Sequence, residues 1–519
     1  MKKINYIATA FIAVLGMASC NPERLEIEQK GVVSEDSYYQ TDEDAFSAAV
    51  VIYSTWNGLN GDILFLNSAL ADEVYTAGAG RGDSPYLDDL NEYNFVSNND
   101  YIIKVYAGLY KLIFYANTLM DKFSEGTSPA IDRCIGEARM ARGWAHMWLA
   151  SLWGNPPIID HVLTGSSEYQ QPNSNPAELW KFITSDFQKA SELLPSKLAG
   201  ADKVRMTKEA ALAFKGKAEV LSGDLKSAKT TLKSVIDSHA FTLEPASKLE
   251  DIMTNACNYS SETVFESNVV YSKSTMWNHI SGLGSMLNWR RDHLSGVPAY
   301  MSTFGFGYCN PREEYMSDLQ AHEAGSARSK AWFKGWEDLQ GLGIGLTSTM
   351  YGCAGYFQYK FHYGPDEIPS DSFGIVFINN WRWMRYPEVL LLYAEACAVE
   401  GDADGSGKAA LNEVQNRAGA PVTDLSLDNV KAEKKFELFM EGTRYVDLVR
   451  WGDAENVLKN QGAYVPLFKG LDAAGNYIVD KTTYTNQNYG FKAKHKLLPY
   501  PEAEIISNQN PNFNQNPEW

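Results

Sequence analysis

A group of aromatic and polar residues has the chemistry that a sugar-binding site needs. A flat ring can stack on the apolar face of a pyranose, and neighbouring amide, guanidinium or carboxylate groups can bind its hydroxyls. The candidates are Trp277, Asn278, Trp289, Arg290 and Tyr300 in the irregular middle of the chain, and Asp72, Arg81 and Tyr86 in an earlier glycine-rich segment. Ordinary packing is the competing explanation for each residue taken singly, so the prediction concerns the cluster.

An acidic turn over residues 402–413 has the spacing of a calcium-binding loop. Acidic or hydroxyl side chains stand at its first, third, fifth and twelfth positions and a glycine at its sixth, so oxygen atoms could surround a hard cation. The candidate ligands are Asp402, Asp404, Ser406 and Glu413. A plain turn between two helices, where aspartate and glycine are also common, is the alternative. Both explanations stay open, and no other cofactor is predicted.

Recognisable catalytic motifs are absent from the sequence. It contains no G-x-S-x-G, H-E-x-x-H, Walker A or G-x-G-x-x-G pattern. Glu437 and Glu441 are one helical turn apart, as a pair of carboxylates for glycoside cleavage could be, but Lys434 and Arg444 are within reach of them. Ion pairing is the better explanation, and no catalytic residue is predicted.

The composition indicates a large, acidic, globular chain. It has 519 residues, a formal net charge of −18 and 45% hydrophobic residues. The apolar content suffices for a sizeable core, and the acidic balance argues against nucleic acid or anionic lipid as partners. The five cysteines after residue 20 form no C-x-x-C pair. Buried thiols and up to two disulfides are both compatible with this pattern.

The first twenty residues have the features of an export signal. Two lysines precede an apolar run, and small residues stand just ahead of Cys20. This pattern predicts a signal peptide over residues 1–19, too short for a spanning helix. The position of Cys20 resembles the site at which bacterial lipoproteins are cleaved and acylated, and several acyl chains would hold the chain stably on a membrane. An ordinary signal with an incidental cysteine is the alternative.

Apolar residues recur at helical spacing along much of the chain. The spacing predicts helices over 42–58, 101–123, 131–153 and 176–194, and a loop over 59–99 that could build a binding site. Residues 207–238 read as a compact helix pair similar to a tetratricopeptide unit. Because one such unit cannot bury its apolar face alone, about three or more must stack.

The second half of the chain alternates between irregular and helical patterns. Residues 268–380 lack periodicity but are rich in aromatic residues and glycine, and they are too long for a passive connector, so we predict a folded, functional lobe. Helical pattern resumes at 381 and continues through 411–419 and 434–452, the last with a break at Gly442. Charges along 434–452 stand three or four residues apart, which fits a ladder of ion pairs or a solvated face.

Several segments together resemble one family. The chain reads E-L-F-M-E-G-T-R-Y-V-D-L-V-R-W-G over 437–452, L-W-G-N-P-P over 152–157 and R-W-M-R-Y-P-E-V-L-L-L-Y-A-E-A over 382–396, and it closes with an asparagine- and proline-rich end. With Cys20, these segments resemble the SusD/RagB family of lipid-anchored nutrient-capture proteins of Bacteroidetes outer membranes. The resemblance is weakest over 59–99 and 268–380, where ligand specificity would vary.

The resemblance implies a mostly helical fold. Four tetratricopeptide-like helix pairs would form a scaffold, the first pairing 42–58 with 101–123, and a loop-rich lobe would pack on it. The expected divisions are a signal peptide (1–19), a tether (20–41), a helical scaffold with the loop 59–99 (42–267), a ligand-binding lobe (268–380) and a C-terminal helix pair with the signature segment (381–519).

The implied function is capture of an oligosaccharide at the outer face of the outer membrane and its delivery to a SusC-like TonB-dependent transporter. Such a protein serves polysaccharide utilization and is not an enzyme. A peptide-capturing member of the RagB type is the first alternative, and a surface glycoside hydrolase is the second.

Overall fold

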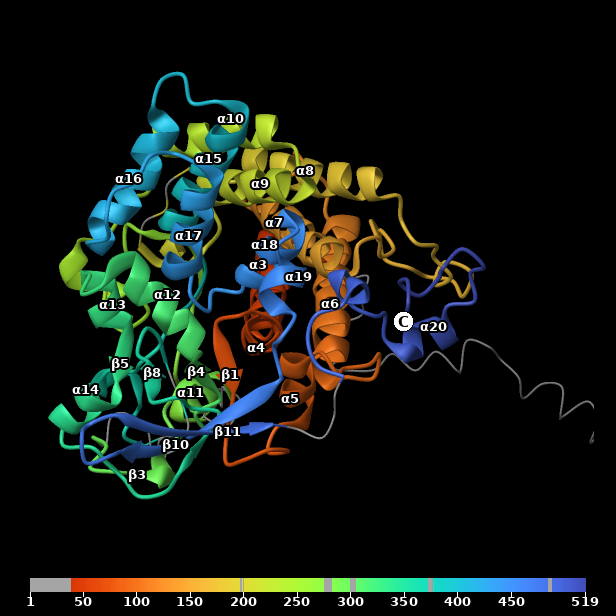
Figure 1. The fold of residues 1–519 in the computed structure, drawn as a ribbon. Coiled ribbons are helices and arrows are strands. Elements are labelled where there is room, and N and C mark those ends of the chain that lie inside the picture. Colours follow the sequence, from red (N-terminus) through yellow and green to blue (C-terminus); the bar gives the residue numbers. More distant parts are fainter. Residues whose placement is uncertain are drawn as a thin grey trace, which may run out of the picture.

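The computed structural model describes residues 39–196, 198, 200–274, 282–298, 305–371, 376, 378–483 and 488–519. The predicted signal peptide and Cys20 lie outside these ranges. The described chain is mostly helical, as predicted, and its longer helices form a scaffold that occupies the upper part of Figure 1. These helices are α3 (Asp42–Asn57), α6 (Asp100–Lys122), α7 (Pro129–Trp153), α8 (Pro176–Leu193), α9 (Lys208–Ser222), α10 (Leu225–Asp237), α15 (Tyr386–Glu400), α16 (Ser406–Ala418) and α17 (Leu427–Glu437).

Helices α9 and α10 confirm the helix pair predicted over 207–238. The side chain of Thr207 caps α9, and the helix ends at Gly223, whose left-handed backbone (φ 85°) a side chain would strain. Asp224 then caps α10. A Cβ atom on Gly216 would lie 2.5 Å from Leu232, so the absence of a side chain on α9 allows the two helices to pack closely.

The scaffold helices pack mainly against their neighbours in the chain. α7 packs on α6 and α8, α9 on α8 and α10, and α15 on α10 and α16. The predicted first pair is confirmed because α3 packs on α6, and it also contacts α7, where the rings of Trp56 and Trp144 lie 4.6 Å apart. The description of these pairs as tetratricopeptide-like stays a prediction.

The prediction of a continuous loop over 59–99 is wrong. The segment contains α4 (Asn60–Leu70), β1 (Val74–Thr76) and α5 (Pro85–Glu92). Every residue from 63 to 70 is buried, so α4 shows no amphipathic period that would reveal it in the sequence. The irregular parts are residues 71–73, 77–84 and 93–99.

The helical pattern predicted from residue 381 begins five residues too early. β9 (Trp381–Arg385) pairs antiparallel with β2 (Thr263–Ser267). α15 starts at Tyr386, because Pro387 suits the first turn of a helix but would remove a needed backbone donor farther inside.

The segment over 268–380 forms a lobe of short elements at the lower left of Figure 1. It has a hydrophobic core of its own that includes Trp289, Trp336 and Phe357. Its elements are α11 (Gly282–Leu287), α12 (Glu313–Glu323), α13 (Ala327–Trp332), α14 (Trp336–Gly341), β3 (Leu294–Ser295), β4 (Cys309–Pro311), β5 (Phe333–Gly335), β6 (Gly345–Leu346), β7 (Met350–Tyr351) and β8 (Tyr356–Gln358).

The C-terminal segment returns to this lobe. Its hairpin pairs with β7, and Phe468 of the hairpin completes the core of the lobe, so the expected division at residue 380 does not separate two packing units. Its elements are α18 (Arg444–Trp451), α19 (Ala454–Leu458), β10 (Tyr464–Leu471), β11 (Tyr477–Thr483) and α20 (Glu502–Ser507).

A buried carboxylate of the signature segment joins the scaffold to the lobe. Glu437, at the end of α17, is fully buried and accepts from Arg328 of α13 (2.9 Å) and Arg385 of β9 (3.0 Å). Arg417 of α16 donates to the same carboxylate. Burial raises the pKa of Glu437, but the three arginines more than reverse this and hold it well below its usual range.

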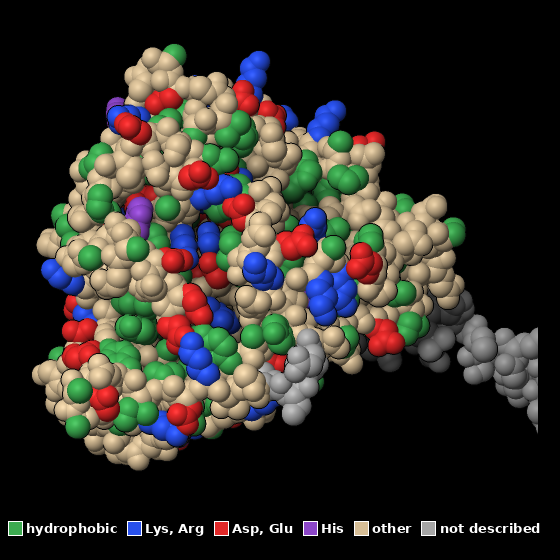
Figure 2. All heavy atoms as spheres, in the orientation of Figure 1, with side chains coloured by type: hydrophobic (Ala, Val, Ile, Leu, Met, Phe, Trp, Pro, Cys, Tyr) green, Lys and Arg blue, Asp and Glu red, His purple; other side chains and the backbone are tan. Residues whose placement is uncertain are grey.

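The charged side chains over 434–452 therefore form ion pairs mostly with residues of other elements. Because these side chains are buried or half-buried, the alternative of a solvent-exposed charged face is excluded. Glu441 binds Lys360 and Arg385, Lys434 lies 2.7 Å from Asp447, and Arg444 turns away to Asp72. Ion pairing of Glu437 and Glu441 is confirmed, but their partners are not Lys434 and Arg444. Lys434 instead pairs with Glu395 and Asp447, and Arg444 lies beyond the break between α17 and α18. Figure 2 shows acidic and basic side chains gathered in the hollow between the scaffold and the lobe.

Two sequence-based questions are answered within the described residues. The five cysteines there, Cys134, Cys257, Cys309, Cys353 and Cys397, are buried and free, so they form no disulfides. None of the described helices has the length and apolarity needed to cross a membrane.

Candidate functional site

A two-stranded sheet brings two distant loops together. β1 and β4 pair antiparallel, with Thr76 opposite Cys309. In an antiparallel pair the segment after one strand lies at the same end as the segment before the other. The glycine-rich loop over 77–84 therefore meets residues 305–308, although more than two hundred positions separate them.

The second loop is fixed by backbone hydrogen bonds to the end of α11. Phe306 donates to the carbonyl of Ser285 (2.7 Å), and Gly307 donates to that of Asn288 (2.8 Å). Gly307 has φ 65°, and a Cβ atom there would lie 2.9 Å from the backbone nitrogen of Arg290. Only glycine fits this close approach, and it places Tyr308 beside Arg290.

Side chains from both loops form a polar cluster. Nη1 of Arg290 lies 3.5 Å from Oδ2 of Asp83, and its Nε lies 2.6 Å from Oδ1 of Asp292. The hydroxyl of Tyr308 donates to Asp83 (3.1 Å). Burial raises the pKa of Asp292, but the hydrogen bond and charge of Arg290 bring it below its ordinary value, so this carboxylate stays ionised.

Aromatic surface borders the cluster. Phe306 is 39% exposed, and its ring packs edge-on against that of Tyr308 with centroids 6.3 Å apart. We call Asp83, Arg290, Asp292, Phe306 and Tyr308 the loop site. A partly exposed ring next to a guanidinium and two carboxylates offers a stacking face with donors and acceptors for hydroxyl groups. With two negative charges and one positive, it favours a neutral ligand over an anion.

The predicted residues divide between this site and the interior. Arg290 belongs to the loop site, and Tyr86, 45% exposed in the first turn of α5, lies three positions after Asp83. Trp289 does not offer a surface ring, contrary to the prediction. It is 6% exposed, and its indole N–H donates to the carbonyl of Gln358 (2.9 Å) inside the lobe core.

The other two candidates of the first loop form ion pairs within the scaffold side of the molecule. Asp72 accepts from Arg444 at 2.7 and 2.9 Å, which ties α18 to the end of α4 and makes Asp72 a structural residue. Arg81 binds Glu92, the last residue of α5, with an Nη2 to Oε2 distance of 2.8 Å. Trp277, Asn278 and Tyr300 lie outside the described residues.

Sequence reasoning missed Asp83, Asp292, Phe306 and Tyr308. A signal for the last two was present, because alternating glycines and aromatics over 305–308 are typical of a backbone that must approach another chain segment closely. No sequence pattern marked Asp83 or Asp292 as a site residue, because the two lie far apart in the sequence and only the fold brings both of them to Arg290.

The acidic turn at 402–413 uses its oxygen atoms to cap α16. Asp402 accepts from the backbone N–H groups of Gly407 (2.7 Å) and Lys408 (2.9 Å), and Asp404 accepts from the N–H and hydroxyl of Ser406. No group of three or more His, Cys, Asp or Glu residues within the described ranges is arranged to hold a metal ion. The geometry fits the plain-turn alternative.

Comparisons with known proteins agree with this architecture. A family model described as "SusD family" matches residues 349–519, and one described as "Starch-binding associating with outer membrane" matches residues 33–218. A SusD-like protein of Bacteroides ovatus is 23% identical, covering 99% of this chain and 97% of its own. SusD-like protein P38 of Formosa agariphila is 24% identical, covering 88% and 94%.

Solved structures share the fold. A laminarin-binding SusD-like protein superposes with a TM-score of 0.77 at 21% identity, covering 93% of this chain and all of the other. Surface glycan-binding protein A from Bacteroides fluxus gives 0.74 at 22% identity, covering 92% of this chain and all of the other. The fold and the two family models thus define a class of mostly helical, SusD-like proteins. Within that class, the chain belongs to the SusD/RagB family.

Proposed function

We propose that this protein captures a neutral oligosaccharide at the cell surface through the loop site. The observation that carries the proposal is the meeting of Arg290, Asp83 and Asp292 with the exposed ring of Phe306, a combination suited to hydroxyl groups on an apolar ring face. Support comes from the structural neighbours, one of which binds laminarin and another of which was solved with laminarihexaose.

Glycan binding is tested by affinity electrophoresis against laminarin and a panel of neutral polysaccharides, with the chain lacking residues 1–20. Phe306→Ala and Arg290→Ala are each expected to weaken binding at least about tenfold, the equivalent of ~1.4 kcal/mol. Phe114→Ala removes an aromatic ring of similar exposure from α6, on the scaffold, and serves as the matched control. Unchanged retardation in both loop-site variants would assign glycan binding to another surface.

Peptide capture is the competing function within the family. The loop site presents side-chain groups, whereas peptide recognition by main-chain pairing needs a row of free backbone donors and acceptors. A peptide library that competes with laminarin for the loop site, or that binds while no polysaccharide does, would favour the peptide ligand.

The same proposal places the protein on the outer membrane, facing outward, with Cys20 as the lipid attachment site. Support comes from the sequence around Cys20 and from the description of the family that matches residues 33–218. Cys20→Ser is expected to move the protein from the membrane fraction to the soluble fraction, and radiolabelled palmitate should label the parent alone. Membrane retention of the serine variant would contradict the lipid anchor.

Transfer to a TonB-dependent transporter completes the proposed function. The scaffold is the expected docking face, because α3 exposes Phe46 and Val50, one helical turn apart and each almost half exposed. A Phe46→Asp/Val50→Asp double variant should copurify less transporter while binding glycan normally. Full copurification would move the docking face elsewhere.

A further inference from the structure

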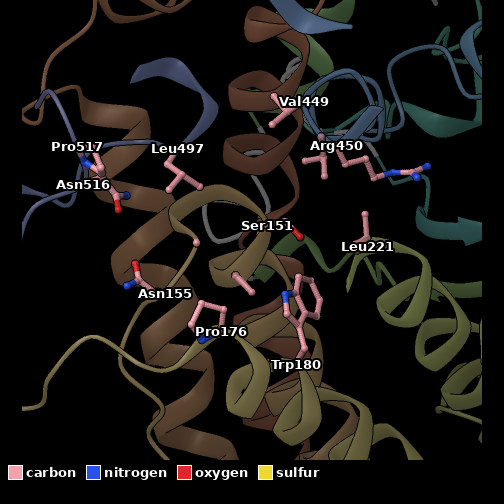
Figure 3. A pocket seen from close by; sticks show the side chains of 13 residues that line it. Ser151, Asn155, Pro176, Trp180, Leu221, Val449, Arg450, Leu497, Asn516 and Pro517 are labelled. Atoms are coloured by element: carbon pink, nitrogen blue, oxygen red, sulfur yellow. The ribbon is translucent and has the colours of Figure 1, made fainter. Parts of the chain in front are cut away.

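A pocket separate from the loop site opens where the end of α7 meets the C-terminal tail. Its volume is about 500 Å³, within the range of ~300–1,000 Å³ typical of small-ligand sites. Helices α7, α8, α9 and α18 contribute to its wall, together with Leu497 and residues 516–517. Figure 3 shows Trp180 rising from α8 toward Ser151 of α7, with Asn155 and Asn516 on one side.

The walls of the pocket are held in place by close packing. α7 ends at Gly154, which has φ 81°, and a Cβ atom there would lie 2.9 Å from Leu497. The side-chain amide of Asn516 donates to the carbonyls of Trp153 (3.1 Å) and Leu498 (2.7 Å), which fixes the tail against α7. These contacts fix the positions of α7 and the C-terminal tail, which form two sides of the pocket.

Several polar atoms at the pocket have unused hydrogen-bonding capacity among the described residues. Nδ2 of Asn155, Nε1 of Trp180 and Oδ1 of Asn516 have no hydrogen-bond partner there, although Asn155 accepts from Tyr500 and Asn516 donates to the backbone. The hydroxyl of Ser151 donates to Met147 (2.7 Å) and keeps its lone pairs for a ligand. Donors and acceptors thus border a half-buried indole ring.

The charge balance of the pocket argues against an anionic ligand. Arg450 is the cationic residue in its lining, but its guanidinium is already bound by Glu395 (2.6 Å) and Asp447 (2.8 Å). An anion would have to compete with both carboxylates, whereas a neutral polyol would leave this ion pair intact.

We propose that this pocket, lined by Trp180, Asn155, Ser151 and Asn516, is a second saccharide-binding site that takes a neutral mono- or disaccharide unit. The indole face stacks on the sugar ring, while the amides and the hydroxyl bind its hydroxyl groups. The ligand class rests on the proposed function, but the site and its residues are distinct from the loop site. The protein would then hold a glycan at two places, and two contacts on one long chain raise its avidity.

The test isolates the pocket by silencing the loop site. The mature chain carrying Arg290→Ala is titrated with laminaribiose, maltose and cellobiose, followed by tryptophan fluorescence and calorimetry. We expect residual binding of at least one disaccharide with a stoichiometry of one. Adding Trp180→Ala should weaken it at least about tenfold, adding Trp180→Phe should weaken it less, and adding Phe114→Ala should leave it unchanged.

The outcomes separate this inference from the proposed function. Absence of disaccharide binding in the Arg290→Ala chain, or equal binding with and without Trp180→Ala, overturns the second site and leaves the loop site untouched. Unchanged laminarin binding by both Arg290→Ala and Phe306→Ala refutes the loop site, and the effect of Trp180→Ala on disaccharide binding still tests the pocket independently. Circular dichroism melting of each variant shows that the comparisons are made on folded protein.

Discussion

Replacing Glu437 by glutamine should strongly destabilise the protein, because it removes a negative charge on which three buried arginines depend. Glu437, Arg328 and Arg385 are each at most 1% exposed, and Arg417 is 8% exposed. Breaking a buried ion pair costs about 3–5 kcal/mol when the remaining charge is left without a partner. Here Arg328 keeps Glu323 and Glu433, and Arg385 and Arg417 keep Glu262, so the cost lies at the lower end of that range. The amide of glutamine keeps the shape and one acceptor, and we expect a loss of about 3 kcal/mol.

The effect has a defined pH dependence. The folded-state pKa of Glu437 is lowered by the arginines, so its contribution to stability is complete above the unfolded-state pKa of about 4.3. As the pH falls below that value, the unfolded chain takes up the proton first and the contribution declines. The difference in unfolding free energy between the parent and Glu437→Gln should therefore be constant near neutral pH and narrow below about pH 4.

Urea unfolding, followed by fluorescence and circular dichroism at pH 7 and at a pH below about 4, measures both effects. Glu400→Gln at the exposed end of α15 is the matched control, because the side chain of Glu400 forms no ion pair or hydrogen bond with the described residues. It should change stability by less than about 0.5 kcal/mol. A loss below about 1 kcal/mol for Glu437→Gln at pH 7, or a difference that grows on acidification, would refute the role given to the buried network.

The remaining predictions concern the lobe core, the acidic turn and a buried histidine. Trp289→Phe should lower the unfolding free energy by about 1–3 kcal/mol, because the hydrogen bond from the indole N–H to the carbonyl of Gln358 is lost. Laminarin affinity should stay at the parent value. A loss of affinity without a loss of stability would show that Trp289 contributes to ligand binding. Calorimetric titration with calcium should give no binding heat. Asp402→Ala should lower the unfolding free energy by about 0.5–2 kcal/mol, because the side chain that caps α16 is lost. A binding heat in the parent that Asp402→Ala abolishes would establish a calcium site. Burial lowers the pKa of His146 to about 3, so the unfolded chain binds the proton first as the pH drops below 6.5. The unfolding free energy should therefore fall by about 2 kcal/mol between neutral pH and about pH 5. His146→Gln should reduce this pH dependence, and an unchanged pH dependence would mean that other groups cause it.

Local patterns in the sequence were enough to predict most of the scaffold. The helices over 42–58, 101–123, 131–153 and 176–194 and the pair over 207–238 follow from apolar periodicity, capping residues and the glycine at 223, which act within a few residues of each other. The same reasoning failed for α4, whose burial on all sides erases the period, and for β9, whose partner strand lies far away in the chain. The family could also be recognised from the sequence, because the segments that are typical of it are short and contiguous.

The binding surface depends on contacts that no local pattern encodes. Trp289 and Arg290 are adjacent in the sequence, yet one is packed in the lobe core and the other reaches Asp83 across the loop site. Likewise the alternating charges over 434–452 suggested pairing along one helix, but the break after Glu437 sends its carboxylate to arginines from three other elements. The sequence by itself determined where most of the scaffold helices lie and which kinds of side chain the chain contains. The tertiary structure alone decided which rings reach the surface and which charges meet, because burial and long-range pairing are properties of how the elements pack.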